Sequence, residues 1–265
     1  MSLEPLLQHV VPFFLVLTRL SGLFLITPVL SSTMVPRNIK VLLLVALALA
    51  VYPMTPAWAM PANLTIVGLV PMVVGELLVG FSIGLIAAIP MYAAEMGGII
   101  IGQQMGFGLA KVYNPEFDAE VDILGQLLFF IIFASYLAMG GFTQVFSALV
   151  ATFERVGPGG IALSQSPVQL IVSVLASGVE LAMRMALPVI AAILLMLVMF
   201  AVITKTMPAI NIMSVGFTAQ VLAGLFVLLL ALPAIAGVAA EETSEIMRQI
   251  DDWSRSLGEQ PGRGV

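Results

Sequence analysis

Long apolar stretches alternate along the chain with short clusters of charged and polar residues. A helix that crosses a bilayer needs about 20 largely apolar residues, since the hydrocarbon core is about 30 Å thick and each residue rises 1.5 Å. Most of the stretches exceed that length. The pattern predicts an all-α, polytopic membrane protein built of long helical hairpins. The stretches are Val10–Leu30, Ile39–Tyr52, Leu64–Ala94, Ile123–Thr152, Val168–Thr204 and Ala209–Ala240.

Prolines lie in or beside these stretches. Each removes a backbone donor and opens the helix one turn earlier, and in lipid the freed carbonyls need other helices or water as partners. The sequence therefore predicts proline-broken helices that are surrounded by protein. Counts of Lys and Arg in successive connections tie between the two sides of the membrane, which leaves the orientation of the N-terminus open. The prolines are Pro12, Pro28, Pro71, Pro90, Pro188, Pro208 and Pro233.

Composition strengthens the membrane interpretation. The chain is 60% hydrophobic and 9% charged, whereas a soluble domain carries about 25% charged residues. The sequence predicts a single helical membrane domain over residues 1–240, followed by an amphipathic, partly flexible tail over residues 241–265 with Ile246, Ile250 and Trp253 on one face. The chain starts without the basic stretch of a signal peptide, so we expect its first apolar segment to be retained. A net charge of −5 without a basic patch argues against nucleic-acid binding.

The catalytic groups of common enzyme classes are missing from the sequence. It holds one histidine, His9, and no cysteine, so a thiolate nucleophile or a thiolate metal site is impossible. The run Gly80-Phe81-Ser82-Ile83-Gly84 matches the nucleophile elbow of hydrolases, which needs a strand–turn–helix context. Inside a helical apolar run, Gly80 and Gly84 instead predict a face where two membrane helices pack closely. We therefore expect no enzyme, no cofactor and no metal.

A second glycine series marks the most informative segment. Gly98, Gly102 and Gly106 repeat every four residues and predict a smooth strip along one helix. The amides Gln103 and Gln104 lie beside the strip and are costly in lipid unless hydrogen-bonded. After it come Met105–Lys111, the turn signal Asn114-Pro115 and a cluster of acidic residues. Two interpretations stay open: a solvated connection between spans, which composition favours, and a re-entrant or pore-facing loop.

Charged residues inside the apolar stretches are the remaining candidates for function. Glu180 and Arg184 are spaced as a helical ion pair with the acid first, which predicts that the two neutralise each other. Arg19 has no acidic neighbour in sequence, so its partner must come from another helix, another subunit or a lipid headgroup. Glu76 and Glu95 are the other carboxylates within apolar runs.

Short motifs in fixed order give the chain a family resemblance. It resembles the FliR family of flagellar biosynthesis proteins, whose counterpart in virulence secretion systems is the T subunit of the export apparatus. The chain departs from the family's pattern at two places. The family often has Asp-Pro where this chain has Asn114-Pro115, and it commonly has Val-Pro where this chain has Val156-Gly157-Pro158. The motifs are Arg19-Leu20-Ser21-Gly22, Thr27-Pro28-Val29, Val35-Pro36-Arg37, Gly75–Gly80, Gly102-Gln103-Gln104-Met105-Gly106, Phe153 with Val156 and Pro158, and Met207-Pro208 with Asn211 and Gly216-Phe217.

The resemblance implies a non-enzymatic subunit of the flagellar type III protein export gate, in the bacterial inner membrane at the flagellar basal body. It implies a helical hetero-oligomeric channel shared with FliP- and FliQ-like subunits, further partners FlhB and FlhA, and unfolded export substrates. Membrane lipids are expected around it. A central loop of the family is thought to plug the closed channel. Carried over by position, the plug consists of Met105, Gly106, Phe107, Gly108, Leu109, Lys111 and Tyr113.

The residues themselves predict close helix packing at Gly80, Gly84, Gly98 and Gly102. They also predict buried polar roles for Arg19, Glu76, Gln104, Glu180 and Arg184, with Glu76 and Arg19 fixing helices by buried pairing. The alternative from another class is a secondary transporter of a small solute, which predicts a binding site between broken half-helices at the membrane midplane. Use in a flagellar or in a virulence system stays open.

Overall fold

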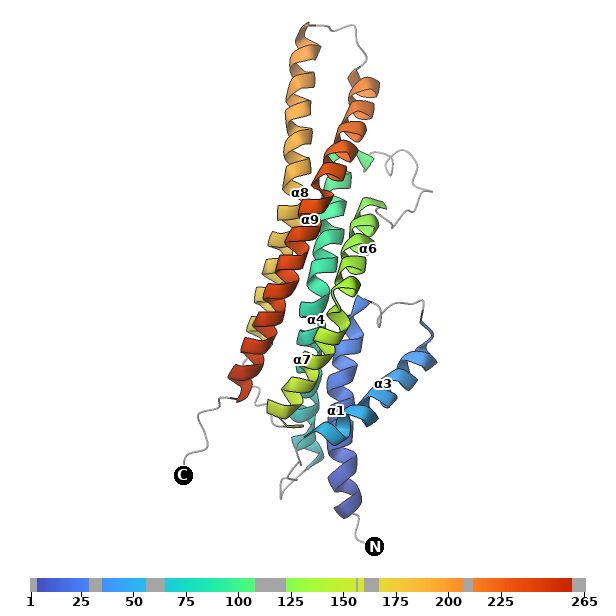
Figure 1. Cartoon of the computed structure of the whole chain (residues 1–265), viewed down its shortest axis with the longest axis vertical. Coiled ribbons are helices and arrows are strands. Elements are labelled where there is room, and N and C mark those ends of the chain that lie inside the picture. The colour runs from blue at the N-terminus through green and yellow to red at the C-terminus, as the bar shows by residue number, and fades with distance from the viewer. Residues whose placement is uncertain are drawn as a thin grey trace. The chain divides into compact units, whose positions relative to one another are not determined.

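The computed structural model describes residues 4–28, 35–55, 65–107, 123–155, 157–159, 167–206 and 212–258, and every regular element among them is a helix (Figure 1). The all-α prediction is confirmed. The elements are α1 (Glu4–Ile26), α3 (Arg37–Val51), the short 3₁₀ helix η1 (Tyr52–Met54), α4 (Ile66–Gln104), α6 (Ile123–Ala138), α7 (Gly141–Arg155), α8 (Pro167–Thr206) and α9 (Ile212–Gly258).

The helices have the length and composition of membrane spans. Within the described ranges, five helices are each long and apolar enough to cross a bilayer: α1, the α3–η1 segment, α4, α8 and α9. Helices α6 and α7 meet the same criterion only as a pair, because a turn at Met139 and Gly140 separates them. The chain is thus a polytopic membrane protein. Its spans overlap the predicted apolar stretches, although the α4 span continues beyond the predicted end at Ala94 to Gln104.

The prediction of proline-broken helices is wrong at most positions. Helix α4 continues through Pro71 and Pro90, α8 through Pro188 and α9 through Pro233. A long helix can absorb one missing donor when neighbouring groups satisfy the freed carbonyl. The chain breaks instead at Gly140, whose φ of 72° is a left-handed conformation that glycine adopts without a steric penalty.

The chain forms two compact units. Unit 1 consists of Met1–Ala88, Gly140–Leu175 and Ser244–Val265, and unit 2 consists of Ile89–Met139 and Ala176–Thr243. Unit 1 contains α1, α3, the first part of α4 and α7, and large fully buried side chains such as Leu15, Ile83 and Leu149 fill its core. In unit 2, the rest of α4 packs with α6 and with the parts of α8 and α9 that lie in Ala176–Thr243, around Ile101, Leu128 and Met185.

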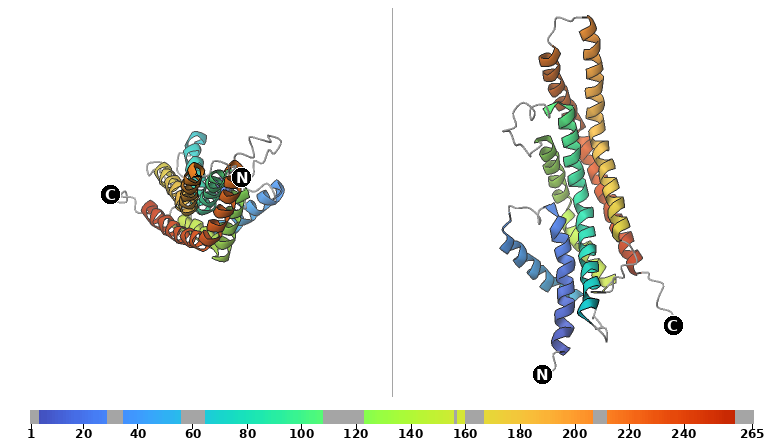
Figure 2. Two further views of the ribbon diagram at one scale, coloured as in Figure 1. Left: turned by 90° about the horizontal axis from the view of Figure 1, so that it is seen from above. Right: turned by 180° about the vertical axis from the view of Figure 1, so that it is seen from behind.

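Helix α9 passes without a break through the boundary predicted at residue 240 and ends at Gly258. The separation of a membrane domain from a tail is therefore not marked by a helix end. The side chains of Ile246, Ile250 and Trp253, which carry the predicted amphipathic face, lie outside the described residues. In unit 2, α8 and α9 run in opposite directions as a hairpin (Figures 1 and 2).

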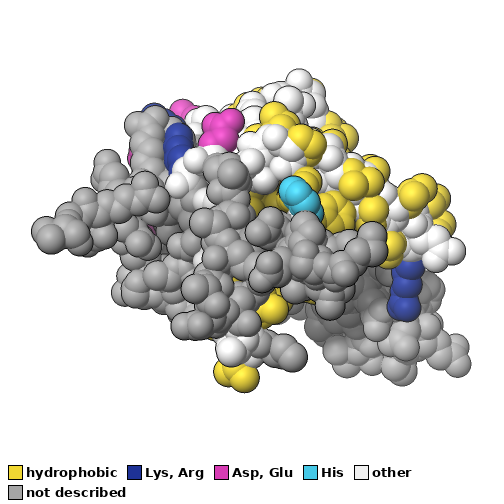
Figure 3. Space-filling view, turned by 90° about the horizontal axis from the view of Figure 1, so that it is seen from below, with side chains coloured by type: hydrophobic (Ala, Val, Ile, Leu, Met, Phe, Trp, Pro, Cys, Tyr) yellow, Lys and Arg dark blue, Asp and Glu magenta, His cyan; other side chains and the backbone are white. Residues whose placement is uncertain are grey.

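Burial differs strongly between the helices. Within its span, α4 is 67% buried, whereas the α3 span is 11% buried and those of α8 and α9 are 22% each. Leu42 on α3, Leu195 on α8 and Leu230 on α9 are all mostly exposed, and hydrophobic side chains gather at the surface in the view of Figure 3. Exposed apolar faces of this extent need lipid or other proteins as cover.

Candidate functional site

Helices α1 and α4 touch through glycine. A Cβ on Gly80 would collide with the backbone carbonyl of Arg19, and a Cβ on Gly84 would lie 2.8 Å from Ile26 Cγ2 and 3.0 Å from the Leu23 carbonyl oxygen. Ser82, between the two glycines, donates its hydroxyl to the Leu78 carbonyl at 2.7 Å. The segment therefore has the helical context of a packing face, and its serine is bonded back to its own helix.

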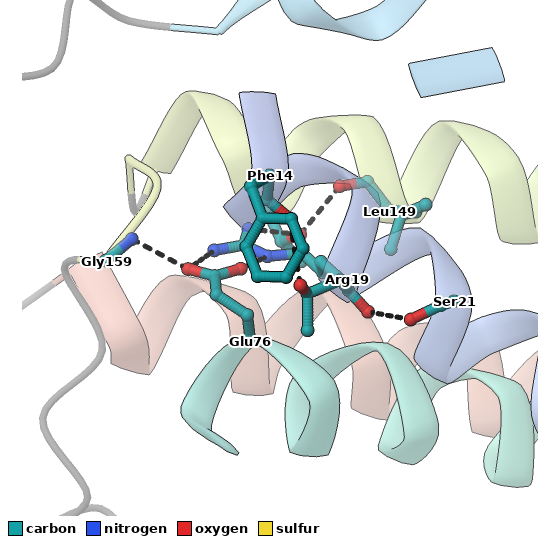
Figure 4. A network of polar contacts seen from close by, with 8 residues as sticks. Phe14, Arg19, Ser21, Glu76, Leu149 and Gly159 are labelled. Atoms are coloured by element: carbon teal, nitrogen blue, oxygen red, sulfur yellow. Dashed lines mark hydrogen bonds and ion pairs between the residues drawn. The ribbon is translucent and has the colours of Figure 1, made fainter. Parts of the chain in front are cut away.

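This close approach brings Arg19 and Glu76 together across the two helices (Figure 4). Arg19 Nε lies 2.5 Å from Glu76 Oε2, and Arg19 Nη2 lies 3.0 Å from Glu76 Oε1. Both side chains are 0% exposed. The planar guanidinium matches the two carboxylate oxygens in a bidentate pair, which is the strong form of a charge-assisted hydrogen bond. Two charges that are each costly in an apolar interior thus neutralise one another.

Helix α7 and the turn after it complete the cluster. Arg19 Nη1 donates to Thr152 Oγ1 at 3.1 Å, and Thr152 donates to the Leu149 carbonyl at 2.6 Å. The Phe153 ring lies 4.0 Å from the guanidinium carbon, a cation–π contact that adds strength when water is excluded. The Gly159 amide donates to Glu76 Oε1 at 2.8 Å. The cluster therefore joins α1, α4, α7 and the turn after α7.

The second glycine series acts within unit 2. A Cβ on Gly98 would lie 2.6 Å from Gly125 Cα and 2.6 Å from the Leu124 carbonyl oxygen, so α4 and α6 meet backbone to backbone. Gly102 is buried one turn further along α4. Tyr92 of α4 and Phe129 of α6 flank the contact with ring centroids 6.1 Å apart. Small residues at such a crossing gain van der Waals contact over a long stretch of backbone.

Helix α4 ends at Gln104 and continues into a tight turn. The Met105 amide donates to the Ile101 carbonyl at 2.9 Å, and the Gly106 amide donates to the Gln103 carbonyl at 3.1 Å. Gly106 has a φ of 90°, and Met105 is completely buried. Of the predicted plug residues, Met105, Gly106 and Phe107 belong to this turn, while Gly108, Leu109, Lys111 and Tyr113 lie outside the described residues.

The prediction that the other polar candidates are buried is wrong. These candidates are Gln104, Glu180 and Arg184. Gln104 is exposed. Glu180 and Arg184 form the expected ion pair at 2.6 Å, but their side chains are 63% and 58% exposed. The reason is that α8 packs only one narrow face within unit 2, which includes Leu181, Met185 and Val189. The charged pair lies on the opposite side of that helix.

Several residues of the site were not predicted from the sequence. Thr152 and Gly159 contribute to the ion-pair cluster, but a hydroxyl and a backbone amide carry no signal of their own. Gln220 and Gly224 on α9 contact the end of α4. Their spacing with Phe217, at three and seven residues, places all of them on one helical face, and that periodicity could have identified them.

Comparisons with known proteins agree with this architecture. The family described as "Bacterial export proteins, family 1" matches residues 10–246. Flagellar biosynthetic protein FliR of Aquifex aeolicus (strain VF5) is 26% identical over 241 residues, 88% of this chain and 90% of that protein. FliR of Escherichia coli (strain K12) is 25% identical over 240 residues, 91% of each. Yop proteins translocation protein T of Yersinia pestis is 27% identical over 212 residues, 79% of each.

The family match runs through the glycine contact of α1 and α4, the buried cluster around Arg19 and the turn at the end of α4. Because it covers nearly the whole chain, the protein belongs to family 1 of the bacterial export proteins, with the flagellar FliR proteins and their virulence-system counterparts.

Proposed function

We propose that this chain is a non-enzymatic subunit of a type III protein export gate, working in the flagellar system. The observation that carries the proposal is the full-length similarity to FliR proteins and to a Yop translocation protein. The chain helps to form a channel in the bacterial inner membrane, at the flagellar basal body, through which unfolded flagellar proteins leave the cell. The apolar spans are consistent with that location.

The segment Met105–Tyr113 closes this channel at rest, with Phe107 and Leu109 as the bulky groups. Its described beginning supports the assignment, because irregular backbone next to membrane spans survives only when it is packed against protein or lines a cavity. Met105 is fully buried and Gly106 lies against the Phe217 ring. The turn is thus anchored at its start, as a closing element has to be.

A leak measurement tests the closing role. Phe107→Gly combined with Leu109→Gly, or deletion of Gly106–Lys111, removes the bulk that blocks the channel. Cells or vesicles with the assembled gate then become permeable to small ions well above the unmodified level. A matched control is Phe130→Gly, which removes an exposed ring of α6 and leaves the membrane tight. An intact seal in the first two variants, at normal assembly, contradicts the assignment.

The exposed apolar faces of α3, α8 and α9 form the contacts with FliP- and FliQ-like subunits, with FlhB and FlhA as further partners. Charge-free faces such as the one around Leu195 and Val198 suit permanent interfaces, which resemble a domain core cut in half.

Purification tests these partners. An affinity-tagged chain, extracted in mild detergent from cells that express the whole system, is expected to carry FliP- and FliQ-like proteins with it. Leu195→Glu and Val198→Glu place charges on the proposed interface and reduce that recovery. A chain that purifies alone and is stable contradicts the proposal and favours a solute transporter.

A further inference from the structure

The end of α4 rests on a single face of α9 within unit 2. Phe217, Gln220 and Gly224 are separated by three and four residues, so they line one side of that helix. We refer to these three residues as the α9 seat. Each of them meets a different residue at the end of α4. The end of α4 therefore contacts α9 at three successive positions over two helical turns.

Gly224 provides room for the side chain of Met105. A Cβ on Gly224 would lie 2.7 Å from Met105 Cγ and 2.9 Å from its Sδ and Cε atoms. The thioether is flexible and can yield to a single methyl group. A larger side chain at residue 224 fills the volume that Met105 occupies, and Met105 is 0% exposed. The two side chains therefore exclude each other.

The other two seat residues hold the backbone of the turn. Gln220 Nε2 donates to the backbone carbonyl of Gln104, one of the carbonyls that a helix leaves without a partner at its end. The Phe217 ring lies 3.0 Å from the position of a Cβ on Gly106, whose φ is 90°. The ring thus covers a glycine whose left-handed backbone conformation other residues rarely adopt.

We propose that the α9 seat is the latch of the gate: it holds the Met105–Phe107 turn in its packed position and sets how often the turn detaches. The proposal rests on the proposed function, since the turn begins the segment assigned to channel closure. Phe217, Gln220 and Gly224 act on that segment through Met105 and Gly106, and are therefore positioning residues. Movement of α9 is then the event that frees the turn.

A thiol-accessibility experiment tests the latch. The chain contains no cysteine, so Phe107→Cys introduces a single thiol, whose labelling by a membrane-permeant maleimide is followed in vesicles that carry the complete gate. Adding Gly224→Leu expels Met105 and raises the labelling rate about tenfold or more, the factor that overpacking of this size produces. The matched control is Gly237→Leu on the same helix, where an added Cβ meets no atom within 4 Å; there the rate stays unchanged.

A compensating variant separates the contact from a general loss of structure. Met105→Ala alone empties the seat and raises labelling. Combined with Gly224→Leu, it restores the slow rate, because leucine fills the vacated volume, and this non-additivity identifies a direct contact. If Gly224→Leu fails to accumulate, Met105→Ala still decides the question.

The outcomes distinguish the latch from the function on which it rests. Equal labelling in Gly224→Leu and Gly237→Leu, or in Met105→Ala and the unmodified chain, overturns the latch even when Phe107→Gly with Leu109→Gly makes the membrane leak. Faster labelling in Gly224→Leu and in Met105→Ala supports the latch. If Phe107→Gly with Leu109→Gly also makes the membrane leak, the closing role is supported as well. Faster labelling without a leak overturns the closing role, and the latch falls with it.

Discussion

Glu76→Ala lowers the stability of the chain by about 3–5 kcal/mol, the cost of removing one partner of a buried ion pair. Arg19 stays 0% exposed and loses both carboxylate contacts, while Thr152 and the Phe153 ring cannot neutralise its charge. The readout is the temperature at which the detergent-solubilised protein loses its monodisperse peak in size-exclusion chromatography. We expect a marked fall in that temperature and reduced accumulation in membranes.

Two further variants test whether the loss of stability comes from the buried ion pair. Glu245→Ala removes the acid of an exposed pair with Arg248, whose contact is 2.7 Å, and costs less than about 1 kcal/mol because solvent screens such pairs. Replacing both buried partners, as Arg19→Met with Glu76→Leu, leaves no lone charge and is less destabilising than Glu76→Ala alone. If the Glu76→Ala and Glu245→Ala variants lose their monodisperse peak at the same temperature, the buried pair contributes no more to stability than the exposed pair.

Gly80→Ala is the second severe substitution. Its methyl group would overlap the backbone carbonyl of Arg19, and backbone cannot move aside as a flexible side chain can. Helices α1 and α4 must separate, at a cost of at least about 1–3 kcal/mol for overpacking. The separation also lengthens the Arg19–Glu76 contact. We expect a lower melting temperature by the same chromatographic measurement, with a smaller yield of assembled protein.

Gly68→Ala is the matched control on the same helix. Its Cβ would meet only Thr65 Oγ1, at 3.4 Å. Alanine favours a helix over glycine by up to about 1 kcal/mol, so this variant melts at the same temperature or higher. A Gly80→Ala protein that behaves like Gly68→Ala would contradict the view that glycine sets the distance between α1 and α4.

The apolar pattern predicted the helices well because hydrophobic segments of that length have one stable solution in lipid, in which the backbone bonds to itself. It also predicted the packing faces, since Gly80, Gly84 and Gly98 carry their spacing in the sequence. The helix breaks were predicted less well. Proline marks a missing donor, but the surroundings decide whether the helix ends, and at Pro90 and Pro188 it continues.

The sequence predicted buried pairing for Arg19 and Glu76, but it did not indicate which residues meet across the helices. Arg19 and Glu76 are 57 residues apart, and Thr152 is 133 residues from Arg19. Nothing local distinguishes Glu76 from Glu95 as the partner, because the choice depends on which faces of α1 and α4 meet. The prediction that Gln104 is buried is wrong for a related reason. The cost of an amide in lipid indicates that the amide needs a partner, but it does not indicate which neighbouring element lies over it.

The distance between the two members of the buried pair bears on how the protein enters the membrane. Arg19 is synthesised before its carboxylate partner, which follows 57 residues later. At about 5–20 residues per second this delay lasts several seconds, during which an arginine in α1 costs about 2.5–3.5 kcal/mol at the centre of an inserting helix. Helix α1 is apolar enough to cross a bilayer, but it carries this cost until α4 has been made. We therefore expect the Arg19–Glu76 contact to form only after α4 has been made, so that α1 and α4 reach their final packing together.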